Sequence, residues 1–238
     1  MDVVELLPRL HLLRFPVGQA YLWRDGDELT LVDAGAVGAG RAIAEAVTAL
    51  GRARGDVRRI VLTHFHEDHA GGAGEFAALS GAEVFAHELD APFVRGERPG
   101  PAPRFEDWEV PVHAEASRHL PKGEPLRPRQ VTALSDGAVL GFGGGARVLH
   151  VPGHTDGSIA LFVPDEGVLF TGDTVAASPV DGSVMPGVFN LDRPRLLASL
   201  RRLAALDAEL ACFGHGEPVV GGASAALRRA ADGERPAG

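Results

Sequence analysis

The chain has 238 residues, of which 45% are hydrophobic and 23% are charged, and this composition excludes wholesale disorder and collagen-like repetition. The net charge of −9 disfavours binding to nucleic-acid phosphates, which requires clustered Lys and Arg. A single cysteine, Cys212, cannot form an internal disulfide, and no apolar run reaches the roughly 18 residues that span a membrane. The chain opens without a basic segment followed by an apolar one. We therefore expect a cytoplasmic protein that binds neither nucleic acid nor membranes.

The first part of the chain alternates segments typical of strands with segments typical of helices. Strands are predicted at 5–15, 21–23, 29–33, 58–63 and 83–86. Asp25-Gly26 marks a hairpin turn, because glycine readily adopts positive φ. Apolar residues at helical spacing predict a helix over about 38–50, which Gly51 can end. A second helix is expected over about 68–79.

Residues 92–128 have a different composition, since they contain eight of the 17 prolines. Proline lacks a backbone N–H, so we expect neither a long helix nor a central strand there. The segment also carries Phe93, Phe105 and Trp108, which a solvated linker would not need. We interpret residues of about 90–128 as a lid inserted into a single domain that covers residues 1–238.

Strand-like segments resume after this insertion. They are predicted at 131–134, 147–151, 159–163, 168–170 and 210–213. A helix is expected over about 193–206, with Asp192 as its cap and Pro194 in its first turn. A last helix is expected over about 222–232, followed by a frayed tail at 233–238.

Four potential metal ligands lie within six residues directly after the predicted strand at 58–63. His64 and His66 are two residues apart, so both side chains leave an extended backbone on one side. Asp68 and His69 follow as the chain turns into a helix. Burying so many polar groups without partners costs kilocalories for each one, so a metal site is the better explanation. The geometry can offer two imidazoles to one ion, and a carboxylate with an imidazole to a second.

Three further strands are each followed by a potential ligand directly after a glycine. These residues are His154, Asp173 and His215. Ligands placed at one end of several strands can converge in one cleft, which is how sheet proteins assemble sites from distant parts of the sequence.

Together these motifs resemble the metallo-β-lactamase superfamily, and most of all its glyoxalase II-like branch. The motifs are His64-x-His66-x-Asp68-His69, Gly153-His154-Thr155, Gly172-Asp173-Thr174 and Gly214-His215-Gly216. Leu31-Val32-Asp33-Ala34-Gly35 also resembles the early strand-to-turn element of the family. The resemblance extends from about residue 20 to about residue 220. It implies an α/β (α+β) fold, a four-layer αββα sandwich with a dinuclear metal site at one edge.

The resemblance also implies a ligand set and an activity. His64, His66 and His154 would bind the first metal, Asp68, His69 and His215 the second, and Asp173 would bridge the two. Two zinc ions per chain are the default for such ligands, although iron or manganese suits them too. The implied protein is a hydrolase in which a metal-bridging hydroxide attacks the carbonyl of a small ester, thioester or lactone. Asp68 would also be the catalytic proton acceptor, and a homodimer is common in such relatives.

Departures from subfamily patterns bear on the substrate. Secreted β-lactamases of the family typically have cysteine or serine where Asp173 stands, and family lactonases use a tyrosine near that position, whereas Tyr21 is the only tyrosine here. Glyoxalase II proper adds a C-terminal region for glutathione, whereas only 23 residues follow His215. Two alternatives stay open: a mononuclear iron oxidoreductase resembling persulfide dioxygenases, and a metal-binding protein without turnover.

The roles of residues outside the ligand set are inferred from their positions in the sequence. Phe93 and Trp108 in the lid, with Met185 and Phe189 after Asp173, are predicted to line an apolar wall for a small-molecule substrate. The imidazoles need groups that orient them, and the candidates are Asp33, Thr63, Thr155 and Ser158. Cys212 lies within a strand and is interpreted as a small buried hydrophobic residue rather than a nucleophile.

Overall fold

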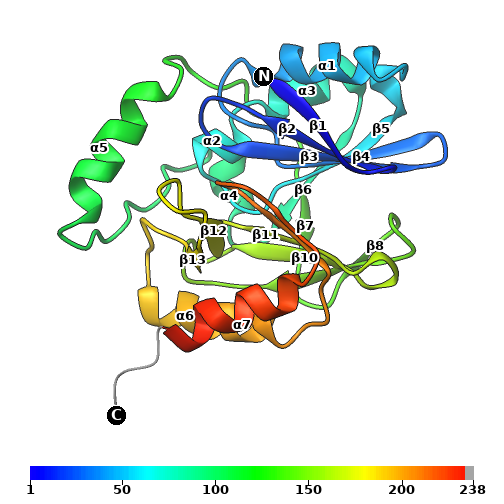
Figure 1. The fold of residues 1–238 in the computed structure, drawn as a ribbon. Coiled ribbons are helices and arrows are strands. Elements are labelled where there is room, and N and C mark those ends of the chain that lie inside the picture. Colours follow the sequence, from blue (N-terminus) through cyan, green and yellow to red (C-terminus); the bar gives the residue numbers. More distant parts are fainter. Residues whose placement is uncertain (234–238) are drawn as a thin grey trace. The chain divides into compact units, whose positions relative to one another are not determined.

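The computed structural model describes residues 1–233, and its internal contacts divide the chain into two compact units (Figure 1). Unit 1 comprises residues 1–100 and 111–134, and unit 2 comprises residues 101–110 and the chain from residue 135 onward. A short stretch of the proline-rich segment thus belongs to unit 2, while the rest of that segment belongs to unit 1. The single domain over 1–238 stays a prediction.

Unit 1 is built on a seven-stranded sheet with its strands in sequence order. The strands are β1 (Asp2–Leu7), β2 (Leu10–Arg14), β3 (Gln19–Asp25), β4 (Glu28–Val32), β5 (Val57–Val61), β6 (Glu83–His87) and β7 (Thr132–Leu134). Neighbours from β1 to β4 are antiparallel, whereas β4, β5, β6 and β7 are parallel. The carboxyl ends of β4 and β5 therefore meet at one edge of the sheet.

Helices connect the parallel strands of unit 1. They are α1 (Ala39–Ala49), the 3-10 turn η1 (Arg54–Asp56), α2 (Glu67–Ala70), α3 (Ala73–Ser80) and α4 (Ala91–Val94). Ile43 from α1 and Phe76 from α3 are fully buried in one cluster with Leu31 and Ile60 from the sheet. Burial of each such side chain stabilises the unit by about 1.5–3 kcal/mol. This core fixes the strand ends on which the first group of candidate ligands lies.

Unit 2 contains a six-stranded sheet in the order β15-β14-β11-β10-β9-β8 and a separate β12–β13 hairpin. The strands are β8 (Val139–Leu140), β9 (Ala146–His150), β10 (Ile159–Val163), β11 (Val168–Gly172), β12 (Val175–Ala177), β13 (Val184–Pro186), β14 (Leu210–Phe213) and β15 (Val219–Val220). Strands β11 and β14 are parallel, and β9 runs in the same direction because β10 is antiparallel to both β9 and β11.

Two helices cover the unit 2 sheet, and the 3-10 turn η2 (Pro164–Glu166) joins β10 to β11. Helix α6 spans Arg193–Ala204 and α7 spans Ala223–Gly233. Leu200 from α6 and Leu227 from α7 share one buried cluster with Leu169 and Phe213. The Asp192 carboxylate accepts a hydrogen bond from the Arg195 N–H at 3.0 Å, so the predicted cap is confirmed.

The structure corrects the predicted bounds of one strand and one helix in unit 1. The strand expected at 5–15 is a hairpin, because Pro8 and Arg9 form the turn between β1 and β2. The helix expected at 68–79 is divided into α2 and α3, which are separated by Gly71 and Gly72.

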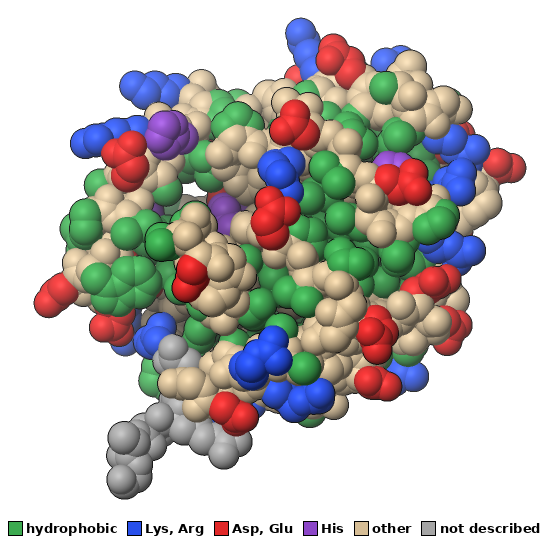
Figure 2. All heavy atoms as spheres, viewed as in Figure 1, with side chains coloured by type: hydrophobic (Ala, Val, Ile, Leu, Met, Phe, Trp, Pro, Cys, Tyr) green, Lys and Arg blue, Asp and Glu red, His purple; other side chains and the backbone are tan. Residues whose placement is uncertain are grey.

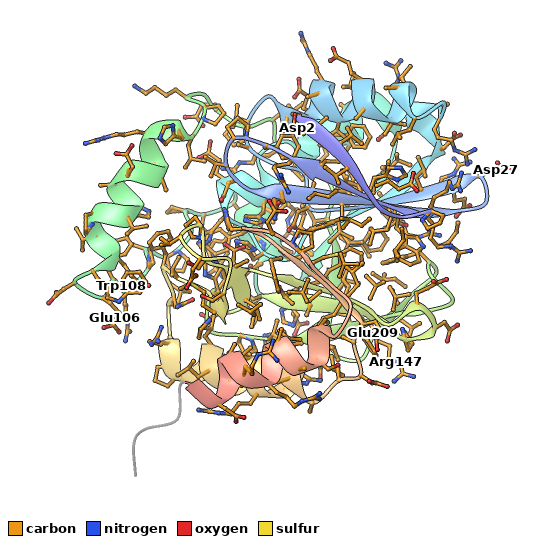
Figure 3. The ribbon with its side chains drawn as sticks, in the orientation of Figure 1. Asp2, Asp27, Glu106, Trp108, Arg147 and Glu209 are labelled. Atoms are coloured by element: carbon orange, nitrogen blue, oxygen red, sulfur yellow. The ribbon has the colours of Figure 1, made fainter. Side chains whose placement is uncertain are left out.

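The proline-rich segment contains an 11-residue helix, α5 (Glu109–His119), so the prediction that excluded a long helix there is wrong. Pro111 lies in the first turn, where a backbone N–H has no partner within the helix. The next proline is Pro121, beyond the helix end. Most of α5 is exposed to solvent, including Val110 and Val112. The side chain of Trp108 is 51% exposed and lies on the segment that leads into α5 (Figure 3).

Acidic and basic side chains are intermixed on the face that Figure 2 shows. Among residues 1–233, none of the helices has the length and apolar character needed to cross a lipid bilayer. The frayed tail predicted at 233–238 lies, apart from Gly233 at the end of α7, outside the described residues.

Candidate metal centre

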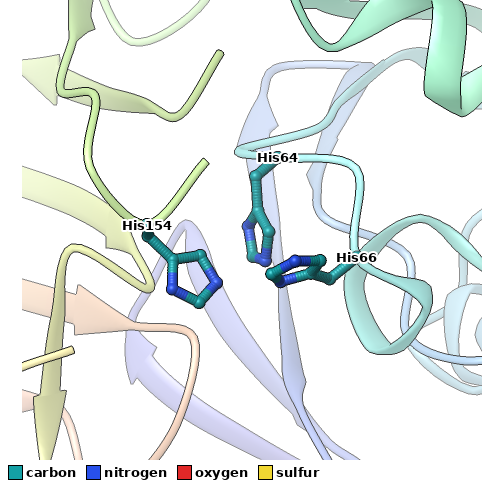
Figure 4. Close-up of side chains that lie close together, drawn as sticks. All are labelled: His64, His66 and His154. Atoms are coloured by element: carbon teal, nitrogen blue, oxygen red, sulfur yellow. The ribbon is translucent and has the colours of Figure 1, made fainter. Parts of the chain in front are cut away.

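The first group of candidate ligands lies at the edge where β4 and β5 end together. We call His64, His66, Asp68 and His69 the unit 1 cluster. His64 and His66 lie on the loop that follows β5 (Figure 4), and Asp68 and His69 lie in α2. The rings of His64 and His66 are 4.8 Å apart and nearly perpendicular, and the rings of His64 and His69 are 4.2 Å apart. The cluster therefore combines three imidazoles and one carboxylate.

Asp33, directly after β4, orients two of these imidazoles. Its carboxylate accepts hydrogen bonds from the Thr63 N–H at 2.7 Å, from the Thr63 hydroxyl at 2.8 Å and from His69 Nδ1 at 2.9 Å. Because the hydroxyl proton of Thr63 points to Asp33, the Thr63 oxygen accepts from His64 Nδ1 at 3.0 Å. Both imidazoles thus carry their proton on Nδ1, and each offers the Nε2 lone pair as a ligand.

Glycine lets the backbone of the unit 1 cluster pack this closely. A side-chain carbon at Gly72 would lie 2.3 Å from the Ala34 carbonyl oxygen, and one at Gly18 would lie 2.6 Å from the Asp68 carbonyl oxygen. Both distances are too short for any residue with a Cβ. The break between α2 and α3 at Gly72 therefore allows α2 to lie against the end of β4, with the Ala34 N–H bonded to the His69 carbonyl at 2.7 Å.

The second group lies where β9, β11 and β14 end. We call His154, Asp173 and His215 the unit 2 cluster; His154 lies on the loop after β9 (Figure 4), and the other two residues follow β11 and β14. One carboxylate oxygen of Asp173, Oδ2, is 3.6 Å from His154 Nε2 and 3.3 Å from His215 Nε2. The parallel pairing of β11 and β14 brings Asp173 beside His215, although 42 positions separate them in the sequence.

Asn190 fixes the orientation of His154. Its Nδ2 donates to the Gly187 carbonyl at 2.8 Å, which leaves its Oδ1 to accept from His154 Nδ1 at 3.3 Å. His154 is almost fully buried and also presents Nε2 toward Asp173. Thr155 and Ser158, which are candidates for the same role by position, bond to each other at 2.8 Å. The sequence offered no motif that singled out Asn190.

The donor atoms of both clusters are of the kinds that bind divalent metal ions. Zinc, iron and manganese bind neutral imidazoles through an available Nε2 lone pair, and they also bind ionised carboxylates. Each cluster contains both kinds of donor, and the bonds from Asp33, Thr63 and Asn190 hold three imidazoles in the tautomer that metal binding requires.

The four residues predicted to contact a substrate lie in different surroundings. The ring of Phe93, in α4, is 4.8 Å from that of Phe65 in unit 1. In unit 2, Phe189 lies 6.0 Å from Phe105, and Trp108 is half exposed. Met185 lies in β13 and lines a cavity of about 490 Å³ in unit 2. Phe189 directly precedes Asn190, whose Oδ1 accepts the hydrogen bond from His154 Nδ1.

Cys212 lies within β14 and is fully buried. Burial raises the pKa of its thiol well above the ordinary value, so the thiolate form is suppressed. This environment agrees with the interpretation of Cys212 as a buried hydrophobic residue rather than a nucleophile.

The sequence profile of the metallo-β-lactamase superfamily matches residues 13–215, which include both clusters. The chain belongs to this superfamily. It is 30% identical over 230 residues to a Bacillus subtilis protein named "Probable metallo-hydrolase YqjP", and the match covers 86% of this chain and 69% of that protein. Membership of the superfamily confirms the family predicted from the motifs.

Relatives with an assigned activity and solved structures extend the comparison. A hydroxyacylglutathione hydrolase of Cereibacter sphaeroides is 32% identical over 158 residues, which cover 66% of this chain but only 48% of the enzyme. A metallo-β-lactamase family protein from Thermus thermophilus, TTHA1429, has a TM-score of 0.67 and 34% identity, covering 96% of this chain and 79% of that one. The metallo-β-lactamase SMB-1 has a TM-score of 0.73 at 23% identity and covers 98% of this chain and 94% of SMB-1. The predicted fold class is therefore confirmed as the α/β fold of the metallo-β-lactamases.

Proposed function

We propose that the unit 1 and unit 2 clusters together bind two divalent metal ions, and that the protein hydrolyses a small ester, thioester or lactone. In this proposal His64, His66 and His154 would hold the first ion. Asp68, His69 and His215 would hold the second, and Asp173 would contribute its carboxylate to both. Membership of the superfamily and the chemistry of the donors support this assignment.

The observation that carries the proposal is the orientation of the imidazoles. A histidine that only fills a core can bond through either ring nitrogen. Here the Nδ1 atoms of His64, His69 and His154 are each engaged by an oxygen that is itself fixed by other bonds. Such orientation is typical of metal centres, in which groups that hydrogen-bond to the ligands fix the tautomer and the direction of each ring.

Zinc is the metal we propose, because imidazole and carboxylate ligands suit it. When bound, such ions polarise a substrate carbonyl and lower the pKa of bound water toward neutrality. The protein's own residues hold the donor atoms in fixed positions and accept one proton. Asp68 is suited to accept that proton, because its carboxylate is partly exposed in the first turn of α2 and lies 3.6 Å from His69 Nε2.

Similarity to hydroxyacylglutathione hydrolases supports a thioester as one substrate class. Hydroxyacylglutathione hydrolases are among the relatives, but this chain spans about half of their length. We propose a small acyl compound as the substrate. Phe93, Trp108, Met185 and Phe189 stay proposed contacts for its apolar portion.

Metal analysis together with a substrate panel tests the proposed function. The purified protein is expected to contain two zinc ions per chain and to hydrolyse at least one member of a panel of thioesters, lactones and esters. Activity should disappear with a chelator and return when zinc is added. A single iron per chain, with oxygen consumption in the presence of a persulfide, would instead establish an oxidoreductase.

A further inference from the structure

The loop at 187–192 carries Asn190, and it is held by a segment far away in the sequence. We propose that Glu109 is a positioning residue for the ligand His154, acting through Phe189 and Asn190. This inference rests on the proposed function, because it concerns the same metal centre. All of the contacts that carry it lie within unit 2.

The loop and His154 are joined by backbone as well as side-chain bonds. The Leu191 N–H donates to the His154 carbonyl at 3.2 Å, and the Asp192 N–H donates to the Gly153 carbonyl at 2.9 Å. The Asn190 side chain adds the bond to His154 Nδ1. A shift of this loop would therefore move the group that decides which nitrogen of His154 carries the proton.

Phe189 gives the loop an unusual backbone conformation. Its φ is 60°, in the left-handed region that residues with a bulky side chain rarely occupy. Such a conformation persists only where the surroundings impose it, and it is found preferentially at functional sites. The Phe189 N–H donates to Glu109 Oε1 at 3.0 Å, which identifies one of the groups that impose it.

The Glu109 carboxylate is itself held in place. It is 1% exposed, and its second oxygen accepts a hydrogen bond from the Glu106 N–H at 2.8 Å. A carboxylate can be buried at acceptable cost when its oxygens are bonded in this way. Glu109 thus joins the start of α5 to the loop that orients His154.

Two neighbouring contacts support the same connection. The Arg104 N–H donates to the Asn190 carbonyl at 2.9 Å, and the ring of Phe105 lies 6.0 Å from that of Phe189. Residues 104–109 therefore contact both Phe189 and Asn190. This stretch belongs to the segment that the sequence predicts to be a lid, so the lid and the metal ligand share one bonded network.

Replacement of Glu109 by alanine, E109A, tests the proposal, and the exposed neighbour variant E106A is the control because it keeps the Glu106 N–H. Nitrogen-15 NMR of the histidine rings in the metal-free protein reports which nitrogen of His154 is protonated. Zinc affinity, measured by competition with a chromophoric chelator, reports the consequence for binding. We expect E109A to lose the Nδ1–H form of His154 and to bind zinc about tenfold more weakly, whereas E106A behaves like the wild type.

Two further variants separate positioning from general damage. E109Q keeps one acceptor oxygen for the Phe189 N–H, so it should retain part of the affinity that E109A loses. Glycine at position 189, F189G, adopts positive φ without strain, so E109A should lose less affinity in an F189G background. Unchanged His154 signals and unchanged affinity in E109A would overturn the inference.

The two proposals can fail separately. If the wild type binds zinc and E109A binds it equally well, the proposed function stands and the positioning role is wrong. If the wild type binds no metal, the proposed function is wrong, and the NMR comparison of the metal-free proteins still decides whether Glu109 controls the tautomer of His154.

Discussion

The carboxylate of Asp33 lies 2.9 Å from Nδ1 of His69 and also accepts two hydrogen bonds from Thr63. This relationship exists because Asp33 and Thr63 lie just beyond the ends of adjacent parallel strands, β4 and β5. One carboxylate thereby sets the protonated nitrogen of His69 directly and that of His64 through the Thr63 hydroxyl. The tautomers of the candidate ligands His64 and His69 therefore both depend on Asp33.

Replacement of Asp33 by asparagine should weaken metal binding by about 10–100-fold, the usual effect of removing a partner of a ligand. The amide lacks the negative charge that favours the Nδ1–H forms of both imidazoles. Isothermal titration with zinc measures the change. The matched control is Asp27→Asn, in which an exposed carboxylate of the same unit is lost; equal affinities of the two variants would contradict the role of Asp33.

Replacement of Asp68 by asparagine should lower kcat by about 10²–10⁴-fold, the range for loss of a positioned proton acceptor. KM should change much less, because the amide keeps the shape of the side chain. Steady-state kinetics on the best substrate of the panel, with the metal content of both proteins measured, provide the comparison. A variant as active as the wild type at equal metal content would remove Asp68 from the chemistry.

Cys212 should be inert in the folded protein. Its thiol is fully buried and has a raised pKa, so both access and thiolate formation are suppressed. We expect no reaction with a chromogenic disulfide reagent in native buffer and one equivalent in denaturant. Cys212→Ala should keep full activity, although it loses some stability. Rapid labelling of the native protein, or a loss of turnover in this variant, would be the opposite result.

Asp136 should contribute to stability at neutral pH and lose this contribution in acid. Burial raises the pKa of Asp136. The hydrogen bonds from the His150 N–H and the Arg202 side chain lower this pKa by more than burial raises it, so the net shift is downward. A carboxyl with a depressed folded-state pKa stabilises the fold above its unfolded pKa of about 3.9 and ceases to do so as pH falls through the folded value.

Asp136→Asn tests this dependence. Urea unfolding at pH 7 should give a lower free energy for the variant, by at most about 1 kcal/mol because both partners are partly exposed. The difference should shrink as pH falls below about 3.9, since the carboxyl group is then protonated first in the unfolded chain and, at the lower folded-state pKa, in the folded protein as well. A difference that stays constant down to acid pH would show that the charge of Asp136 is not responsible.

The candidate ligands could be picked out in the sequence because they lie shortly after strands. The dense cluster at 64–69, and the glycine before each of His154, Asp173 and His215, are local patterns that one chain displays. Pairing of β4 with β5 and of β11 with β14 then brings their ends together, as parallel strands must.

The residues that orient the ligands were less predictable. Asp33 and Thr63 could be named only as candidates by position, and Asn190 and Glu109 have no local signature. The bond from the Phe189 N–H to Glu109 joins residues 80 positions apart, and only tertiary structure brings them together. Helix α5 was not predicted because the sequence analysis considered how many prolines the segment contains and not where they lie. Pro111 lies in the first turn of α5, where a proline does not disrupt a helix.

The central claim is that the unit 1 and unit 2 clusters share two metal ions. Its most direct test is metal stoichiometry by inductively coupled plasma mass spectrometry for the wild type, for His64→Ala in unit 1 and for Asp173→Ala in unit 2. We predict two zinc ions per chain in the wild type and a loss of metal in both variants, with Asp173→Ala reducing retention of both ions. A wild type without stoichiometric metal, or one whose metal content neither substitution changes, would contradict the account.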